Sequence, residues 1–206
     1  MPFTREGYGQ VEPNQLSAQK TGQIYASLPL DKNVKVLQNG EFMYYDYAAE
    51  NGGMVTADPA NAIGEPMLVF NEIKLYEPFW QTTYKDFAMI RVGDAYVTSR
   101  KATAAYGDGA ETVGADLEDH VEYGYRMNGI APRMFKTNIG DIYTTNMVKT
   151  GVEYEVGNLL KPVKNDETNT LVLEKVSDAG TGMVWQVAKV YTMPDGQPGL
   201  KIQRVQ

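Results

Sequence analysis

The stretch TNIGDIYTTN (137–146) has a near twin earlier in the chain, IRVGDAYVTS (90–99), and a weaker third copy, EVGNLLKP (155–162). In each copy a β-branched residue precedes Gly, and a β-rich run follows the Asp or Asn. Glycine allows a tight corner without a Cβ clash, and an adjacent Asp or Asn accepts backbone N–H groups. An amide could not replace a catalytic carboxylate, so the third copy argues against chemistry. We predict turns that start strands at Gly93 and Asp94, Gly140 and Asp141, and Gly157 and Asn158.

On both sides of this stretch the chain is a series of short β-rich runs separated by turn signals. VKVLQNGEFMYYDYA (34–48) predicts a hairpin around Asn39-Gly40, and PDGQPG (194–199) predicts the turn that joins the last two strands. Residues 102–131 interrupt the pattern as a long loop, in which only 115–127 suits a short helix. The sequence therefore predicts an all-β fold, a sandwich or barrel of short antiparallel strands.

The chain divides into three expected regions. Residues 34–150 form a β-rich body, and 151–206 form a C-terminal β subdomain or a continuation of that body. Residues 1–33 are rich in Gln, Gly, Ser and Pro and lack periodicity, so we expect an extended N-terminal arm. The arm would lie against its own body or, as we favour, a neighbouring molecule. Its apolar residues are the expected partner contacts: Phe3, Tyr8, Val11, Leu16, Ile24, Tyr25 and Leu28.

Composition excludes several kinds of site. The 206 residues include no cysteine and a single histidine, His120, so thiolate chemistry, Cys-based metal sites and a multi-histidine metal centre are excluded. The net charge is −7 and the Lys and Arg residues are scattered, which disfavours nucleic acid as a partner. There is no apolar run of membrane-spanning length and no signal-peptide pattern at the N-terminus, so we expect no membrane contact and synthesis in the cytoplasm without a cleaved signal.

No recognised catalytic pattern is present. His120 lies among Asp116, Glu118 and Asp119 without a nucleophile motif nearby, and this acidic group lacks the spacing of a calcium loop. A glycosidase pair drawn from distant strands has no pattern that selects it. No phosphate loop and no serine elbow occur. We therefore expect no enzyme activity and assign no catalytic, cofactor-binding or metal-binding residue.

Aromatic residues leave a second kind of binding open. Tyr44, Tyr45 and Tyr47, with Phe79 and Trp80, could stack on sugars, but neighbouring strand residues point to opposite faces. Some of these tyrosines must then be core residues. Core packing or contact between subunits explains the group better than sugar binding.

Together, the polar N-terminal segment, the cysteine-free acidic β body, the Gly-Asp strand starts and MPDGQPG (193–199) resemble an auxiliary capsid protein of a tailed bacteriophage, a decoration or cement protein. The likeness covers much of 67–206 and is most evident in PRMFKTNIGDIYTTN (132–146) and VEYEVGNLLKP (152–162). The resemblance implies a virion structural protein on the capsid surface that reinforces the shell. Its expected partners are the major capsid protein and neighbouring copies of itself, with a homo-oligomer left open. The alternatives are a carbohydrate-binding or host-attachment β module and a head–tail connector or tail component.

Overall fold

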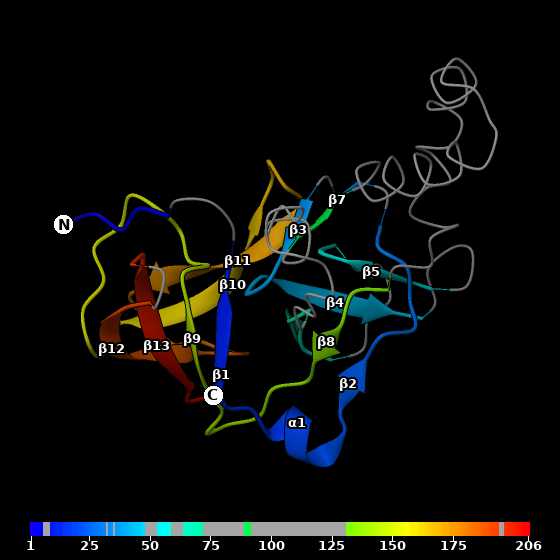
Figure 1. Ribbon diagram of the computed structural model, residues 1–206, viewed down its shortest axis with the longest axis horizontal. Coiled ribbons are helices and arrows are strands. Elements are labelled where there is room, and N and C mark those ends of the chain that lie inside the picture. The colour runs from blue at the N-terminus through cyan, green and yellow to red at the C-terminus, as the bar shows by residue number, and fades with distance from the viewer. Residues whose placement is uncertain are drawn as a thin grey trace, which may run out of the picture.

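The computed structural model describes residues 1–5, 9–31, 33–34, 36–47, 53–58, 64–71, 89–91, 131–193 and 196–206, with the backbone alone at 89–91. This part of the chain is nearly all β, which confirms the predicted fold class, and it curls into an antiparallel half-barrel (Figure 1). The long loop expected over 102–131, with its short helix, lies outside the described residues.

Within the described residues the main sheet contains eleven strands, and every strand pair in it is antiparallel. These strands are β1 (Val11–Gln15), β2 (Ile24–Tyr25), β4 (Phe42–Asp46), β5 (Met54–Thr56), β6 (Met67–Val69), β8 (Met134–Phe135), β9 (Ile142–Thr145), β10 (Leu159–Asn165), β11 (Thr170–Val176), β12 (Trp185–Thr192) and β13 (Pro198–Arg204). A separate pair joins β3 (Val36–Gln38) to β7 (Met89–Arg91).

The strand order in the main sheet is β1-β9-β13-β12-β10-β11-β4-β6-β8-β2, and β5 pairs with β4 outside this path. The strands of 151–206 therefore lie between β9 and β4 in one continuous sheet. The described pairing between the two parts of this sheet is narrow, because β11 meets β4 at Leu171 opposite Phe42. A second contact supports the junction, since the ring of Phe42 packs on Trp185 of β12 at 5.9 Å between centroids.

The N-terminal segment was expected as an extended arm, but residues 11–25 are built into the sheet of their own chain. They supply both terminal strands of the sheet path, β1 beside β9 and β2 beside β8, with helix α1 (Ser17–Thr21) between them (Figure 1). The arm was misread because its apolar residues occur singly, and the sequence does not show that each one fills a separate place in a distant core. Leu16, for example, is fully buried.

Helix α1 was not predicted, and its caps explain its position. Gly22 ends it in the left-handed conformation with φ of +71°, which favours glycine. At the other end Leu16 supplies no side-chain cap. The carboxylate of Asp141, far along the chain, accepts the N–H of Ser17 at 2.9 Å instead. The helix therefore depends on a tertiary contact that local sequence does not reveal.

The expected hairpin at Asn39-Gly40 does not form. Asn39 and Gly40 do make a turn, but β3 before it pairs with β7, and β4 after it pairs with β5, β6 and β11. The positive φ is confined to Gly40, whereas a two-residue hairpin of the Asn-Gly type needs it at both residues. By contrast, β12 and β13 pair as expected, from Trp185 opposite Arg204 to Thr192 opposite Pro198. Of the turn predicted at 194–199, residues 194 and 195 lie outside the described residues, and 198–199 belong to β13.

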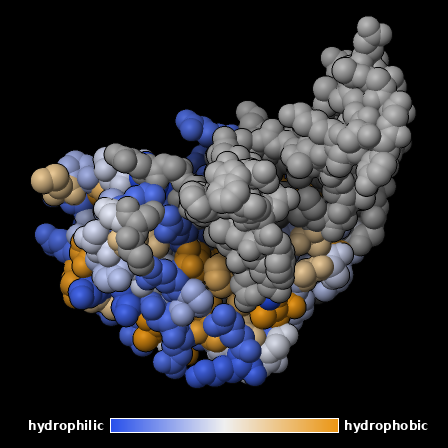
Figure 2. All heavy atoms as spheres, viewed as in Figure 1, coloured by the Kyte–Doolittle hydropathy of each residue, from blue (hydrophilic) through white to orange (hydrophobic). Residues whose placement is uncertain are grey.

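The core extends across both parts of the sheet. Trp185 is fully buried, and besides Phe42 it contacts Tyr143 of β9 edge to face at 5.0 Å. On the face shown in Figure 2 hydrophilic side chains dominate the described surface, with separate apolar groups between them. Among the described residues, no helix has the length and apolar character needed to cross a membrane.

Candidate functional site

The Gly-Asp step at 140–141 closes a tight turn before β9. The N–H of Asp141 donates to the carbonyl of Asn138 at 3.0 Å, and Gly140 has φ of +94°. Ile139 keeps a negative φ, which makes this a type II turn, a turn that favours glycine at its third position. The Asp141 carboxylate in turn accepts the N–H of Asn138 at 2.9 Å. Glycine and acid therefore both close this turn.

The same turn occurs twice more along the described chain, closed by Glu41 and by Asn158. The glycines before these residues have φ of +92° and +91°. In both turns the side chain of the fourth residue accepts the N–H of the first, at 2.7 Å and 2.9 Å. We call these three segments, 38–41, 138–141 and 155–158, the glycine turns. Gly93 and Asp94, the remaining predicted pair, lie outside the described residues.

Each glycine turn is attached to a neighbouring strand segment by the same two hydrogen bonds. The glycine N–H donates to the carbonyl of one partner residue, and the N–H of that residue donates to the carbonyl of the turn's fourth residue. The six distances all lie between 2.8 and 2.9 Å. Two turn residues thus oppose one partner, as in a β-bulge that begins with glycine. The three partner residues are Val69, Arg204 and Val187.

The glycine turns differ in what they do with the second residue. Asn39 is buried, and its side chain bonds the backbone of Asn71. Ile139 and Val156, in contrast, are 70% and 68% exposed. Two of the three turns therefore hold a large apolar side chain in solvent on a backbone that is fixed by four hydrogen bonds.

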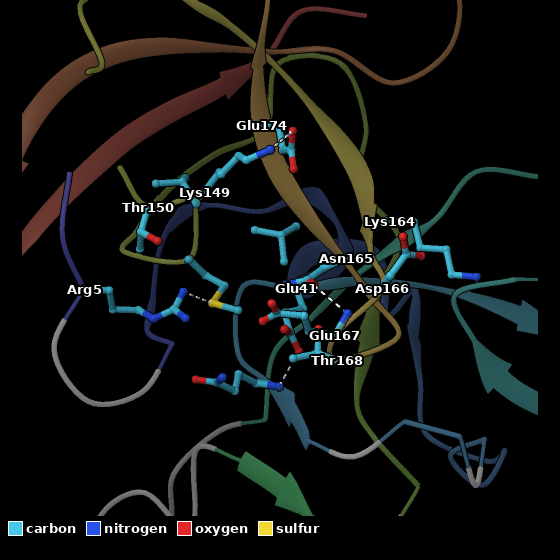
Figure 3. A pocket seen from close by; sticks show the side chains of 14 residues that line it. Arg5, Glu41, Lys149, Thr150, Lys164, Asn165, Asp166, Glu167, Thr168 and Glu174 are labelled. Atoms are coloured by element: carbon cyan, nitrogen blue, oxygen red, sulfur yellow. Dashed lines mark hydrogen bonds and ion pairs between the residues drawn. The ribbon is translucent and has the colours of Figure 1, made fainter. Parts of the chain in front are cut away.

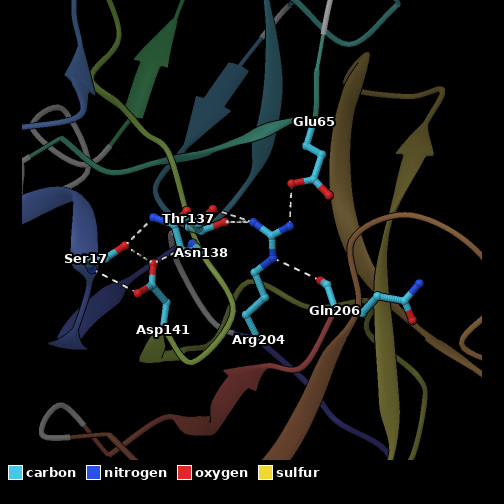
Figure 4. Close-up of polar contacts among 7 residues, drawn as sticks. All are labelled: Ser17, Glu65, Thr137, Asn138, Asp141, Arg204 and Gln206. Atoms are coloured by element: carbon cyan, nitrogen blue, oxygen red, sulfur yellow. Dashed lines mark hydrogen bonds and ion pairs between the residues drawn. The ribbon is translucent and has the colours of Figure 1, made fainter. Parts of the chain in front are cut away.

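The Asp141 carboxylate also forms hydrogen bonds to the N-terminal helix (Figure 4). Besides the bond to Asn138, its carboxylate accepts both the N–H and the hydroxyl of Ser17, each at 2.9 Å, and Asn138 donates to the same hydroxyl at 2.7 Å. Arg204, whose backbone bonds this turn, is buried and donates to Thr137 and Glu65. One turn therefore attaches the N-terminal helix to the last strand of the sheet.

The expected arm contacts lie mostly against the chain's own core. Phe3, Leu16 and Leu28 are buried there, and the ring of Phe3 meets Tyr154 edge to face at 5.7 Å. Three others are half-buried and pack on the same core: Val11, Ile24 and Tyr25. Tyr8 lies outside the described residues. Partner contact by the buried members would require the segment to leave its own sheet.

The tyrosines considered for sugar binding do not form one exposed platform. Tyr45 is buried, and its hydroxyl accepts the N–H groups of Ser27 and Leu28. Tyr44 is half-buried and Tyr47 is exposed. Phe79, Trp80 and His120 lie outside the described residues. Within the residues that the structure describes, no group of three or more potential metal ligands occurs.

A cavity of about 430 Å³ lies between the N-terminal residues, the 147–150 segment and the β10–β11 hairpin (Figure 3). Sequence reasoning did not find it, because its residues come from four separated parts of the chain. Met147, Val148 and Val172 form an apolar wall. Its charged residues are Arg5, Glu41, Lys149, Lys164, Asp166, Glu167 and Glu174.

Glu41, the acid of the first glycine turn, lines this cavity and is fully buried. Its carboxyl accepts the N–H of Gln38 at 2.7 Å and the hydroxyl of Thr170 at 2.9 Å. The Thr170 hydroxyl lies 2.7 Å from that of Thr168, which is half-buried and lines the cavity. Burial raises the pKa of Glu41 to about 7, against the opposing effect of its hydrogen bonds and of the Arg5 charge. The carboxyl can therefore change its charge near neutral pH.

Among the described residues, Arg5 is the cation of the cavity that has no carboxylate in an ion pair with it. Its guanidinium donates to the sulfur of Met147, a weak acceptor, and it has no ion pair within the described part of the chain. Burial lowers its pKa, and the charge of Glu41 acts in the opposite direction. Lys149 and Lys164, by contrast, are paired with Glu174 and Asp58 at 2.8 and 2.9 Å. The cavity thus combines spare guanidinium donors with a titratable acid in its lining.

The QNGE pattern (38–41) repeats the glycine and acid of NIGD (138–141), so this repeat is the sequence signal that could have singled out Glu41. No signal of that kind marks Arg5.

Comparisons of the chain with protein-family models, with curated proteins and with solved structures give no match.

Proposed function

We propose that the protein is a structural component of a tailed-bacteriophage particle, which binds the outside of the capsid and reinforces the shell. Its partners are the major capsid protein and neighbouring copies of itself. The observation that carries the proposal is the pair of exposed apolar side chains, Ile139 and Val156, on two glycine turns of one sheet.

These side chains are suited to contact because their backbone is already ordered. Binding normally costs entropy when loops and side chains become fixed at an interface. Here each turn is fixed beforehand by its own bonds and by the pair to a neighbouring strand. Burying such a side chain contributes about 1.5–3 kcal/mol to the free energy of binding. Because the turn is already ordered, little of this is offset by lost conformational entropy.

The two turns also adjoin one continuous sheet. They precede β9 and β10, and the strand order places β13 and β12 between these strands. Three strand spacings correspond to about 14 Å across the sheet. A partner with two acceptor sites at matching separation would be engaged twice by one molecule, which raises the overall affinity on a repeating lattice.

The first test is the protein content of particles whose genome encodes this chain. Gel analysis and mass spectrometry of purified particles should show it in many copies, in proportion to the major capsid protein. A few copies per particle would place it in the neck or tail, and its absence from particles would refute a virion role.

The second test addresses the turns. Purified protein is added to shells that lack it, and bound protein is measured after sedimentation. Ile139→Ser and Val156→Ser should each weaken binding by about tenfold or more, in line with the loss of one buried apolar side chain. Val163→Ser and Val190→Ser are matched controls, since these valines are exposed on strands instead of turns. Equal losses in the controls, or no loss in the turn variants, would contradict the assigned contact.

A further inference from the structure

We propose that the cavity beside Arg5 binds the carboxylate of a small aliphatic acid or of a peptide chain end, and that ligand binding is coupled to proton uptake by Glu41. This site is independent of capsid binding by the glycine turns, because none of the exposed turn side chains lines it.

The donors of the cavity favour an anion. The Arg5 guanidinium has five N–H groups, and its bonded partner in the described chain is a thioether sulfur. A planar carboxylate matches the guanidinium with two parallel hydrogen bonds, and such charge-assisted bonds are the strong ones. The Thr168 hydroxyl, on the hairpin side of the cavity, is a second donor of suitable type.

The acids of the cavity restrict the anion to a single negative charge. Asp166, Glu167 and Glu174 line it, so a dianion such as phosphate would meet more repulsion than a carboxylate. The apolar wall of Met147, Val148 and Val172 suits the aliphatic part of such a ligand. A cation is disfavoured because Glu41 is fully buried and both of its oxygens already accept hydrogen bonds.

Glu41 explains why binding should depend on pH. An ionised carboxylate in the cavity lining repels an incoming anion, whereas the neutral acid does not. The Thr170 hydroxyl donates to the buried carboxyl at 2.9 Å and lies 2.7 Å from the Thr168 hydroxyl in the cavity, which gives the proton a path. The charged groups that line the cavity come from each element around it: Arg5, Lys149, Lys164, Asp166, Glu167 and Glu174. Of these, Arg5 is the group whose charge shifts the pKa of Glu41.

Ligand-observed NMR titrations of the full chain with sodium butyrate test the proposal, with butyramide as the neutral control ligand. Butyrate should bind and butyramide should not. Arg5→Gln should weaken butyrate binding by about tenfold or more, the loss expected for one charge-assisted pair. Lys164→Gln should change it less than about twofold, because that lysine is already paired with Asp58 on the rim.

The pH arm separates the role of Glu41 from general electrostatics. At constant ionic strength butyrate should bind about tenfold more tightly at about pH 6 than at about pH 8, because the neutral fraction of an acid with a pKa near 7 changes by that factor. Glu41→Gln should remove this difference and bind at both values as the natural chain does at the lower pH. The amide can keep both bonds, since its oxygen accepts from Gln38 and its nitrogen donates to Thr170.

A peptide with a free carboxyl end, compared with the same peptide amidated, distinguishes the source of the carboxylate. If the peptide with a free carboxyl end binds more tightly than butyrate and the amidated peptide does not, the ligand is a peptide chain end. If that peptide binds more weakly than butyrate, the ligand is a small acid. The proposal is overturned if neither carboxylate binds at the lower pH, if Arg5→Gln binds as before, or if Glu41→Gln retains the pH dependence. Urea unfolding of every variant ensures that these comparisons are made between folded proteins.

Discussion

Substituting Asp141 by Asn is the sharpest test of the glycine-turn geometry. From the sequence, Asp141→Asn should be nearly neutral, because Asn occupies the same place in the third copy. The structure predicts a loss of stability, since the side chains at the two positions accept different numbers of hydrogen bonds. Asp141 accepts three hydrogen bonds, from two groups of Ser17 and from Asn138, whereas Asn158 accepts the N–H of Glu155.

The magnitude follows from counting acceptors. An amide has one oxygen, which can serve Ser17 or Asn138 but not both N–H groups as the carboxylate does. Its nitrogen could donate to the Ser17 hydroxyl, but it would face the remaining N–H as a second donor. A buried N–H left without an acceptor costs about 1–3 kcal/mol, and Asp141 is itself buried. We therefore expect Asp141→Asn to lower the free energy of unfolding by about 1–2 kcal/mol and Asp141→Ala by about 3 kcal/mol.

Urea unfolding followed by circular dichroism measures these differences. Asn158→Asp is the matched control and should stay within about 0.5 kcal/mol of the natural chain, because either side chain offers the single oxygen required. Amide exchange at Ser17 should also accelerate in Asp141→Asn, as the helix loses its cap. If Asp141→Asn and Asn158→Asp have the same unfolding midpoint as the natural chain, the second carboxylate oxygen is not needed and the reasoning fails.

Three further expectations follow from buried charge, glycine contacts and the N-terminal strands. Between about pH 4.5 and 7 the folded chain holds the proton of Glu41 while the unfolded chain releases it. The free energy of unfolding should therefore fall by about 3 kcal/mol as pH rises through this range. Urea unfolding at several pH values should show this decline as a change in the difference in unfolding free energy between the natural chain and Glu41→Gln. Gly40→Ala should be clearly more destabilising than Gly140→Ala, although both glycines have a positive φ. A Cβ at Gly40 would lie 2.6 Å from Met147, whereas nothing lies within 4 Å of a Cβ at Gly140. Equal urea unfolding midpoints for the two variants would contradict this. Deleting 1–30 should abolish cooperative unfolding, because it removes β1, β2 and buried core residues; a truncated chain that keeps a cooperative transition would show that the segment is dispensable.

Local sequence predicted the fold class because strand runs and turn signals are local properties. Gly140 and Asp141 could be assigned to a turn from their own chemistry, since a positive φ and an acceptor for backbone N–H groups are needed at a corner. The bond from Asp141 to Ser17 spans 124 positions in the chain, and no local pattern indicates it. The same distinction explains why the N-terminal segment was expected to be an extended arm.

The cavity was missed for a related reason. Arg5, Glu41 and Thr170 carry no shared motif, and tertiary packing alone brings them to one place. The raised pKa of Glu41 arises first from burial, and the burial of an acid cannot be read from a sequence in which it stands beside an ordinary Asn-Gly turn. The number of charged residues can be counted from a sequence, but the surroundings of each charged side chain cannot be read from it.

The glycine turns finally separate the requirements of the fold from those of function. Their third and fourth residues are constrained by backbone geometry, because glycine best suits the positive φ and only an acceptor can bond the first N–H. The second residue is free of both requirements. It is a buried Asn39 where the turn faces the core, and an exposed Ile139 or Val156 where it faces solvent. Ile139 and Val156 are therefore the turn residues that the proposed contact with a partner would use, because the fold itself does not require an apolar side chain at this position.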